Sequence, residues 1–201
     1  ASPCGSKIAA ANSRVIGVLS TNVTSDVNLF DFDNTSGILS NPMTFDFPFQ
    51  SQMYAPYGLE FSPNSKYLYV STGYSYFGIA QFDIQSGSES DIANSRIDII
   101  SYSSSGGGAL QTGPDGKIYH ARWGENSIGV INNPNQQGIN CNYVENQTNL
   151  SNGTLSQGGL PTFYNSMFFS SNSCDSTAIL NLTINNSSPS TDTQVHCDSY
   201  T

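Results

Sequence analysis

One short motif occurs three times in the sequence, and this repetition limits the possible folds more than any other feature. Each copy starts at a proline in a turn, continues through a lysine and ends in a strand-like run. The copies are "SPCGSKIAAA" (2–11), "SPNSKYLYVS" (62–71) and "GPDGKIYHAR" (113–122). Repetition at a period of about 50 residues is typical of a chain built from similar supersecondary units. We therefore expect one architecture repeated along the chain.

Further short runs surround each copy of the motif. They are rich in Tyr, Phe, Ile and Val and are bounded by Gly, Pro, Asn and Ser, which is typical of strands. The runs are 57–62 and 108–113 before a turn, 27–33, 78–84 and 127–133 after the motif, and 96–102 as an example of a more variable fourth run. About four strands per unit predict an all-β fold, with a partial β-propeller of about three four-stranded blades over residues 1–170. A β-sandwich is the alternative, but sandwiches do not repeat a turn and a lysine at this period.

A complete propeller typically closes with about 4–8 blades. Three blades alone would leave an exposed sheet edge and an uncovered blade face. We therefore expect the sequence to be part of a longer polypeptide, and we expect the three-blade arc not to fold alone.

The character of the sequence changes near Ser170. Aromatic residues become rare, and Ser, Thr and Asn become frequent. The run "TAILNLTIN" (177–185) alternates as a strand does, and "NSSPSTD" (186–192) has the composition of a turn or linker. We therefore place a domain boundary here and predict that residues 171–201 are a linker and the start of an Ig-like β-module.

The charge balance excludes two classes of partner. The chain has 6 Lys and Arg against 15 Asp and Glu, so it lacks the basic footprint that nucleic acids or anionic membranes require. No apolar run approaches the roughly 20 residues that span a bilayer, so we expect no direct membrane insertion. Only 10% of the residues are charged, which together with the many Ser, Thr and Asn residues is typical of secreted all-β proteins.

Four cysteines occur without any CxxC pair, which favours disulfides in an oxidising compartment over a zinc site. The segments "CDST" (174–177) and "CDSY" (197–200) repeat each other, and this favours a disulfide between Cys174 and Cys197. Cys4 and Cys141 are left open: both are free, or they pair with each other, or with parts of a longer chain.

Five segments together resemble the propeller region of large secreted surface proteins of Bacteroidota. They are "APYGLEFSPNSKYLYVSTG", "IAQFDIQSGS", "GALQTGPDGKIYHARWGENSIGVINNPN", "CNYV" and "GLPTFYNSMFF". Those proteins are type IX secretion substrates and are often gliding-motility-associated or adhesin-like. The tail from Cys174 resembles the Cys-containing repeats of large adhesins. Two features depart from the family pattern: Cys4 stands where the other turns carry Asn64 or Asp115, and no sorting domain is present.

The resemblance implies a role without an assigned reaction. We expect a non-enzymatic segment of a secreted, cell-surface adhesin or gliding-motility-associated protein, which acts as a display or ligand-binding scaffold. The implied partners are a surface glycan or a protein ligand, and the type IX secretion machinery during export. No cofactor and no resident metal is implied.

Two titratable residues are candidates for site chemistry. Glu60, like Gln111 in the next repeat, lies three positions before the turn proline, where it would belong to a polar ring lining the propeller channel. Metal-dependent propeller lactonases use such rings, so a hydrolase of this type is the alternative function; hydration of the channel is the simpler interpretation. His120 is a candidate general base, but no nucleophile motif accompanies it, and a structural histidine between blades is favoured.

Aromatic residues suggest a third function, carbohydrate binding. Trp123, Tyr74 and Tyr76 would lie at a blade rim, where exposed rings can stack on sugars; packing between blades is the favoured interpretation for Trp123. The segment "DFDNTSG" (31–37) has acidic residues at alternate positions but lacks the glycine and glutamate of a calcium loop, so a strand end with an Asx-type turn is favoured. Ser176, in "DST", resembles an O-glycosylation site of Bacteroidota.

Overall fold

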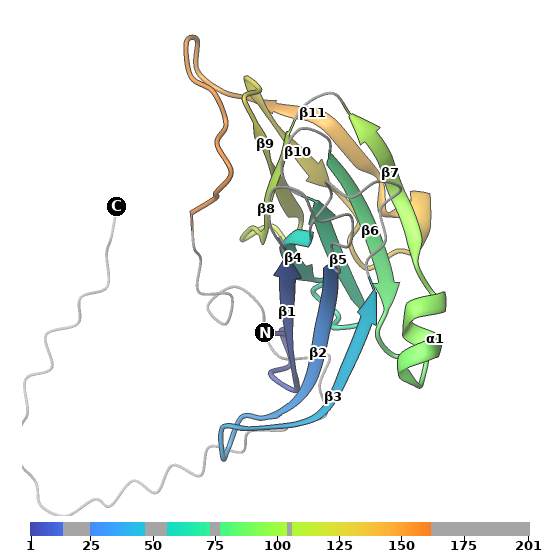
Figure 1. Cartoon of the computed structure of the whole chain (residues 1–201). Coiled ribbons are helices and arrows are strands. Elements are labelled where there is room, and N and C mark those ends of the chain that lie inside the picture. The colour runs from blue at the N-terminus through green and yellow to red at the C-terminus, as the bar shows by residue number, and fades with distance from the viewer. Residues whose placement is uncertain (14–24, 47–55, 73–76, 104–105, 162–201) are drawn as a thin grey trace, which may run out of the picture.

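The computed structural model describes residues 1–13, 25–46, 56–72, 77–103 and 106–161, which form three antiparallel sheets (Figure 1). Sheet A has the order β1-β2-β3, sheet B the order β4-β5-β6-β7 and sheet C the order β8-β9-β10-β11. The strands are β1 (Lys7–Ser13), β2 (Ser25–Asp33), β3 (Ile38–Asp46), β4 (Pro56–Phe61), β5 (Tyr67–Thr72), β6 (Phe77–Asp83), β7 (Ile97–Ser103), β8 (Gly106–Thr112), β9 (Ile118–Trp123), β10 (Ser127–Ile131) and β11 (Tyr143–Asn149).

The predicted all-β fold is confirmed, because each predicted strand that falls within the described residues overlaps a strand of this structure; the predicted strand 177–185 lies outside them. Sheets B and C have four strands each, as predicted. Sheet A has three strands in the described residues. The predicted tail module, residues 171–201, lies outside the described residues.

The repeated turn is also a repeated hydrogen-bonded geometry. In each copy a backbone N–H donates to the carbonyl three residues earlier: Gly5 to Ser2 at 2.9 Å, Ser65 to Ser62 at 2.8 Å and Gly116 to Gly113 at 3.0 Å. The donor residue has a positive φ in all three, 70°, 56° and 74°. Glycine adopts this conformation without strain, whereas Ser65 adopts it at a cost. The chain therefore turns from one strand to the next in the same way three times.

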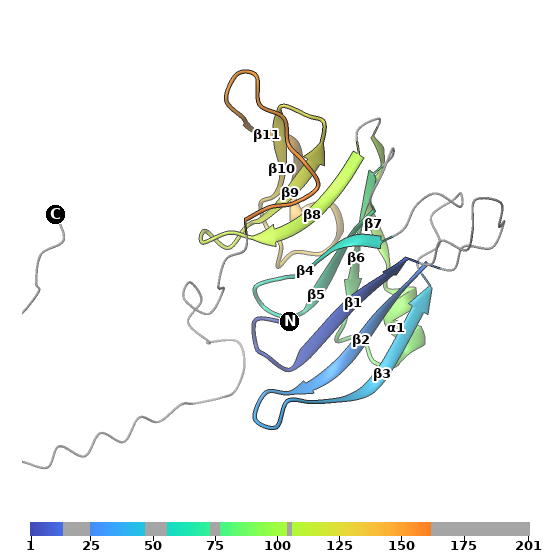
Figure 2. The ribbon, with the colours of Figure 1, turned by 60° about the vertical axis from the view of Figure 1, so that its left-hand side comes forward.

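The three sheets follow one another with their faces in contact, and β4 lies between β1 and β8 (Figure 2). We call the face of a sheet that is directed toward the preceding sheet its front face, and the opposite one its rear face. In sheet A, which no described sheet precedes, the rear face is the one that contacts sheet B, and the front face is the opposite one. Residues in register across neighbouring strands share a face. Equivalent front rows are Ile8 and Phe30 in sheet A, Phe61, Leu68 and Phe82 in sheet B, and Thr112, Ile118 and Ile131 in sheet C. Equivalent rear rows are Ala9 and Leu29, then Glu60, Tyr69 and Gln81, then Gln111, Tyr119 and Val130.

Two apolar clusters join the sheets. The first lies between sheets A and B and includes the ring pair Phe45 and Phe82, whose centroids are 5.0 Å apart. The second lies between sheets B and C and includes Tyr69, Ile79 and Ile118. All these side chains are almost fully buried. Each sheet is therefore held mainly by the face of its neighbour.

A short helix, α1 (Glu89–Asn94), connects β6 and β7 at the outer rim of sheet B (Figure 1). Ser88 and Asp91 form a capping box at its start. Ile92 inserts into the cluster between sheets A and B. The carboxylate of Glu89 accepts the backbone N–H of Thr44 in β3 at 2.9 Å. The helix thus attaches sheet B to sheet A at the rim.

Candidate functional site

Glu60 lies on the rear face of sheet B, where sheet C covers it. Its side chain is 9% exposed. Oε2 accepts the backbone N–H of Thr112 in β8 at 3.1 Å, and Oε1 accepts the N–H of Phe61 at 3.2 Å. Burial raises the pKa of the carboxyl, against the effect of these hydrogen bonds. The expectation that Glu60 lines an open channel is therefore not what the structure shows: the carboxylate joins two sheets.

Two further side chains of the same row join sheet B to sheet C, and the sequence analysis did not single them out. The hydroxyl of Tyr69 donates to the carbonyl of Pro134 at 2.8 Å. The side-chain oxygen of Gln81 accepts the N–H of Gly138 at 2.8 Å, and its amide nitrogen donates to Tyr69 at 2.7 Å. The alternation of residues along a strand indicates which side chains share a face of the sheet. It does not indicate whether a second sheet covers that face.

Gln111 has the place in sheet C that Glu60 has in sheet B, but no further described sheet covers it. It lies at a cavity of about 380 Å³ on the rear face of sheet C. The cavity is lined by Gln111, Pro114, Asp115, Tyr119, Ile128 and Leu160, among others. The two members of the predicted polar ring therefore lie on successive rear faces, one covered and one open.

His120 is fully buried on the front face of sheet C. Its Nδ1 lies 3.0 Å from the hydroxyl of Tyr143 in β11. Burial, together with the neighbouring Arg122, lowers the pKa of the imidazole to about 3, so it is neutral at physiological pH. This geometry suits a structural histidine between two sheets and gives a solvent-borne substrate no access to the ring.

An ion pair between the buried Arg122 and the half-buried Glu145 lies beside His120. Arg122 is 3% exposed, and its guanidinium donates to the carboxylate of Glu145 at 2.6 Å and to the hydroxyl of Ser127 at 3.1 Å. It also donates to the side chain of Asn146. Removal of Glu145 is costly, because it leaves the guanidinium charge of Arg122 buried. This cluster fixes β9 against β10 and β11.

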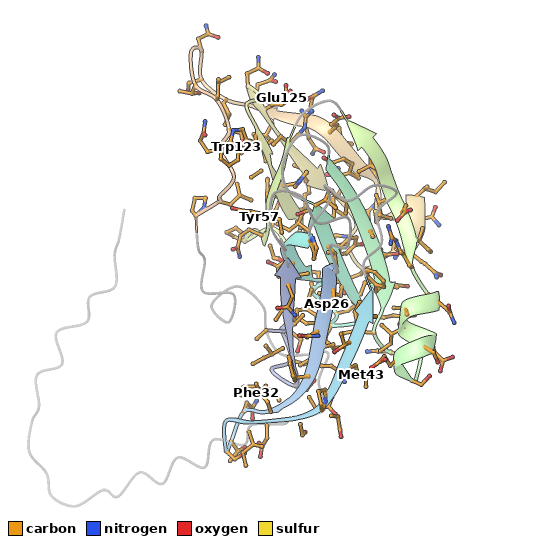
Figure 3. All side chains as sticks on the ribbon, viewed as in Figure 1. Asp26, Phe32, Met43, Tyr57, Trp123 and Glu125 are labelled. Carbon is orange, nitrogen blue, oxygen red and sulfur yellow. The ribbon has the colours of Figure 1, made fainter. Side chains whose placement is uncertain are left out.

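Trp123 differs from Glu60 and His120, the other predicted binding residues that the structure describes, because 56% of its surface is exposed. Its indole and the hydroxyl of Tyr57 both lie beside Gly158: a Cβ at this glycine would be 3.0 Å from the indole and 3.2 Å from that hydroxyl. Tyr57 is 51% exposed. Figure 3 shows both aromatic side chains on the same side of the molecule. We call Trp123, Tyr57 and Gly158 the aromatic surface.

The remaining predicted residues are either described by the structure without forming a site or lie outside the described residues. Asp33 accepts the N–H of Thr35 at 2.9 Å and the hydroxyl of Ser36 at 2.6 Å, which is the predicted turn. Cys4 and Cys141 are both free thiols. Tyr74, Tyr76, Cys174, Ser176 and Cys197 lie outside the described residues. Among the residues that the structure does describe, no group of His, Cys, Asp and Glu is arranged to hold a metal ion.

Comparison with known proteins gave no match to a family model, to a curated protein or to a solved structure. Within the described segments, no helix has both the length and the apolar composition needed to cross a membrane.

Proposed function

We propose that the chain is a non-enzymatic scaffold segment of a secreted, cell-surface adhesin or gliding-motility-associated protein. In this proposal the three sheets are successive blades of a β-propeller, exported by the type IX secretion system. The non-enzymatic assignment is supported mainly by the environments of Glu60 and His120, because each side chain has a polar partner and is buried between two sheets. The surface location is supported by the sequence motifs and by the low content of charged residues.

The non-enzymatic assignment is tested with Glu60→Gln and His120→Gln. We expect both to lower the free energy of unfolding, and we expect neither the wild type nor the variants to hydrolyse lactones with or without added Ca²⁺ or Zn²⁺. Lactone turnover by the wild type that the Glu60→Gln variant lacks would establish the lactonase alternative instead.

The location is tested by protease digestion of intact cells of the organism that encodes the chain. A surface protein is digested before lysis and is lost from the surface when the type IX machinery is deleted. A chain that resists protease until the cells are lysed contradicts the proposal. A periplasmic protein serves as the control for cell integrity.

The aromatic surface supports a second candidate function, carbohydrate binding by the scaffold. Two aromatic side chains from different sheets, Trp123 of β9 and Tyr57 of β4, are each about half exposed and lie beside the same glycine. Rings exposed in this way suit stacking against the apolar face of a sugar. The stacking alone does not select one sugar over another.

Glycan-array binding tests this candidate. Trp123→Ala and Tyr57→Ala should each reduce binding to any glycan that the wild type retains. Leu155→Ala is a matched control, because Leu155 is 56% exposed as well and has no aromatic ring. Unchanged binding after both aromatic substitutions would exclude this surface as the site.

A further inference from the structure

The loop that follows β11 contains the only Asn-Gly pair in the sequence, Asn152–Gly153. Both ends of this loop are hydrogen-bonded to the turn between β9 and β10, through the backbone N–H groups of Leu150 at 2.8 Å and Ser156 at 2.7 Å. Residues 151–155, which lie between these attachments, are all exposed. The Asn-Gly pair therefore lies at the exposed tip of a loop whose ends are held.

Asn152 and Gly153 are the two central residues of a β-turn. The N–H of Thr154 donates to the carbonyl of Ser151 at 3.0 Å, and Gly153 has a φ of 81°. A positive φ at the third residue is the pattern of a type II turn and favours glycine there. In the part of the chain that the structure describes, neither the Asn152 amide nor the Gly153 N–H has a hydrogen-bond partner, and a Cβ at Gly153 would meet no atom within 4 Å. Both groups are therefore free to move and open to water.

An asparagine in such a position can react with the backbone that follows it. The nitrogen of Gly153 loses its proton to base and attacks Cγ of Asn152, the Cγ–Nδ2 bond breaks, and ammonia leaves as a succinimide ring closes. Water then opens the ring. Opening at Cγ gives aspartate, whereas opening at the main-chain carbonyl gives isoaspartate, in which the chain continues through the former side chain. The net reaction consumes water and releases ammonia, and it needs no other reactant.

We propose that Asn152 is a deamidation site of the folded protein, which converts to aspartate and isoaspartate without an enzyme. The product adds a negative charge to a chain whose formal net charge is already −9. The attachments at Leu150 and Ser156 lie outside the turn, so the extra main-chain atom of isoaspartate is confined to the loop. This inference depends on the backbone of the loop and not on the proposed function, so either can fail without the other.

The third repeated turn contains the comparable pair Asp115–Gly116, and there the structure prevents the same ring closure. The N–H of Gly116 donates to the carbonyl of Gly113 at 3.0 Å. The carboxylate of Asp115 accepts the N–H of Lys117 at 3.2 Å and the hydroxyl of Tyr119 at 3.0 Å. The nitrogen that would attack and the group that it would attack are therefore both held in hydrogen bonds. A following glycine alone does not define the site.

Asn64, in the second repeated turn, is an asparagine that the fold protects in the same way. Its Oδ1 accepts the hydroxyl of Ser62 at 2.7 Å and the N–H of Lys66 at 3.2 Å. The N–H of the following Ser65 donates to the carbonyl of Ser62 at 2.8 Å. Asn64 is therefore the matched internal control: it is followed by a small residue, but its amide and the next N–H are both bonded.

Mass spectrometry of chymotryptic peptides, after incubation of the full chain at several mildly alkaline pH values, tests the proposal. Cleavage after Leu and aromatic residues gives the peptides 151–155 and 62–67, in each of which one asparagine occurs. We expect the peptide with Asn152 to gain the mass difference between an amide and an acid, at a rate that rises in proportion to the hydroxide concentration. An isoaspartate form of it should elute separately. Asn64 should keep its amide in the folded chain and lose it faster in urea.

A substitution and a reference peptide complete the test. Asn152→Gln should abolish the conversion at this position, because the longer side chain closes its ring far more slowly. A synthetic peptide of residues 150–156 gives the rate without the fold. A folded chain that keeps the Asn152 amide while this peptide loses it overturns the proposal, because the turn then protects Asn152. Equal conversion of Asn152 and Asn64 in the folded chain overturns it as well, because hydrogen bonding then does not select the site.

Discussion

Oε2 of Glu60 accepts the backbone N–H of Thr112 at 3.1 Å, across the boundary between sheets B and C. Replacement of Glu60 by alanine leaves this buried N–H without an acceptor. We expect Glu60→Ala to lower the free energy of unfolding by about 1–3 kcal/mol. Urea denaturation followed by tryptophan fluorescence measures this loss, and a change within experimental error would show that Glu60 does not join the two sheets.

Glu60 also predicts a dependence of stability on pH. Because burial raises its pKa, the folded protein binds this proton more readily than the unfolded chain does. The contribution of Glu60 to stability therefore grows as the pH falls through the folded pKa and decreases above it. Relative to Glu60→Gln, the wild type should gain stability on acidification. The comparison uses urea denaturation of both proteins at a series of pH values.

His120 predicts the opposite trend. Its pKa is lowered from 6.5 to about 3, so the unfolded chain binds a proton that the folded protein does not. This contribution to stability is complete above pH 6.5 and is lost progressively between pH 6.5 and 3. The loss of stability in this range should be smaller in His120→Gln than in the wild type. Equal slopes in the two proteins would contradict a buried, neutral imidazole.

Gly58 lies where the first strands of sheets B and C approach most closely. A Cβ there would be 2.5 Å from the hydroxyl of Ser71 and 2.7 Å from the carbonyl of Gly108. We expect Gly58→Ala to destabilise the protein by about 1–3 kcal/mol through overpacking. Gly159→Ala is the matched control, because a Cβ at Gly159 would meet no atom within 4 Å, and its thermal midpoint should be unchanged.

Cys4 should react with alkylating reagents near neutral pH. Burial raises the pKa of its thiol, but hydrogen bonds with Ser2, Ser6 and Ser65 outweigh this effect and lower the pKa to about 7. Cys141 is buried and has a raised pKa, so it should react only on unfolding. The rate of iodoacetamide labelling against pH, read by mass spectrometry, gives the pKa. A midpoint near that of free cysteine would contradict this assignment, and Ser6→Ala should raise the midpoint.

The strands and their turns could be predicted from the sequence because their signals are local. Alternating apolar residues such as Leu68 and Val70, and turn residues such as Pro63, need no knowledge of distant contacts. Helix α1 could not be predicted from periodicity, because six residues are fewer than two turns. The capping box of Ser88 and Asp91 was the only local signal for it.

The environment of the candidate residues was harder to predict than the strands. The position of Glu60 relative to the turn identifies its row in the sheet, and the sequence correctly relates it to Gln111. Which rows are covered depends on how whole sheets stack, and this is not a local property. For the same reason the exposure of Tyr57 and the burial of Arg122 beside Glu145 could not be predicted from the residues around them.

Each boundary between sheets is bonded at two separate places. Sheets A and B are joined where Ser65 accepts the N–H of Cys4 at 3.1 Å, and again at the rim through Glu89. Sheets B and C are joined through Glu60 on the first strand, and farther out through Gln81 and Gly138. Two sheets held at both the inner and the outer end cannot swing apart as a hinge does. A pulling force that separates two neighbouring sheets would therefore load both sets of hydrogen bonds at once, and the stack of sheets should resist bending at each boundary.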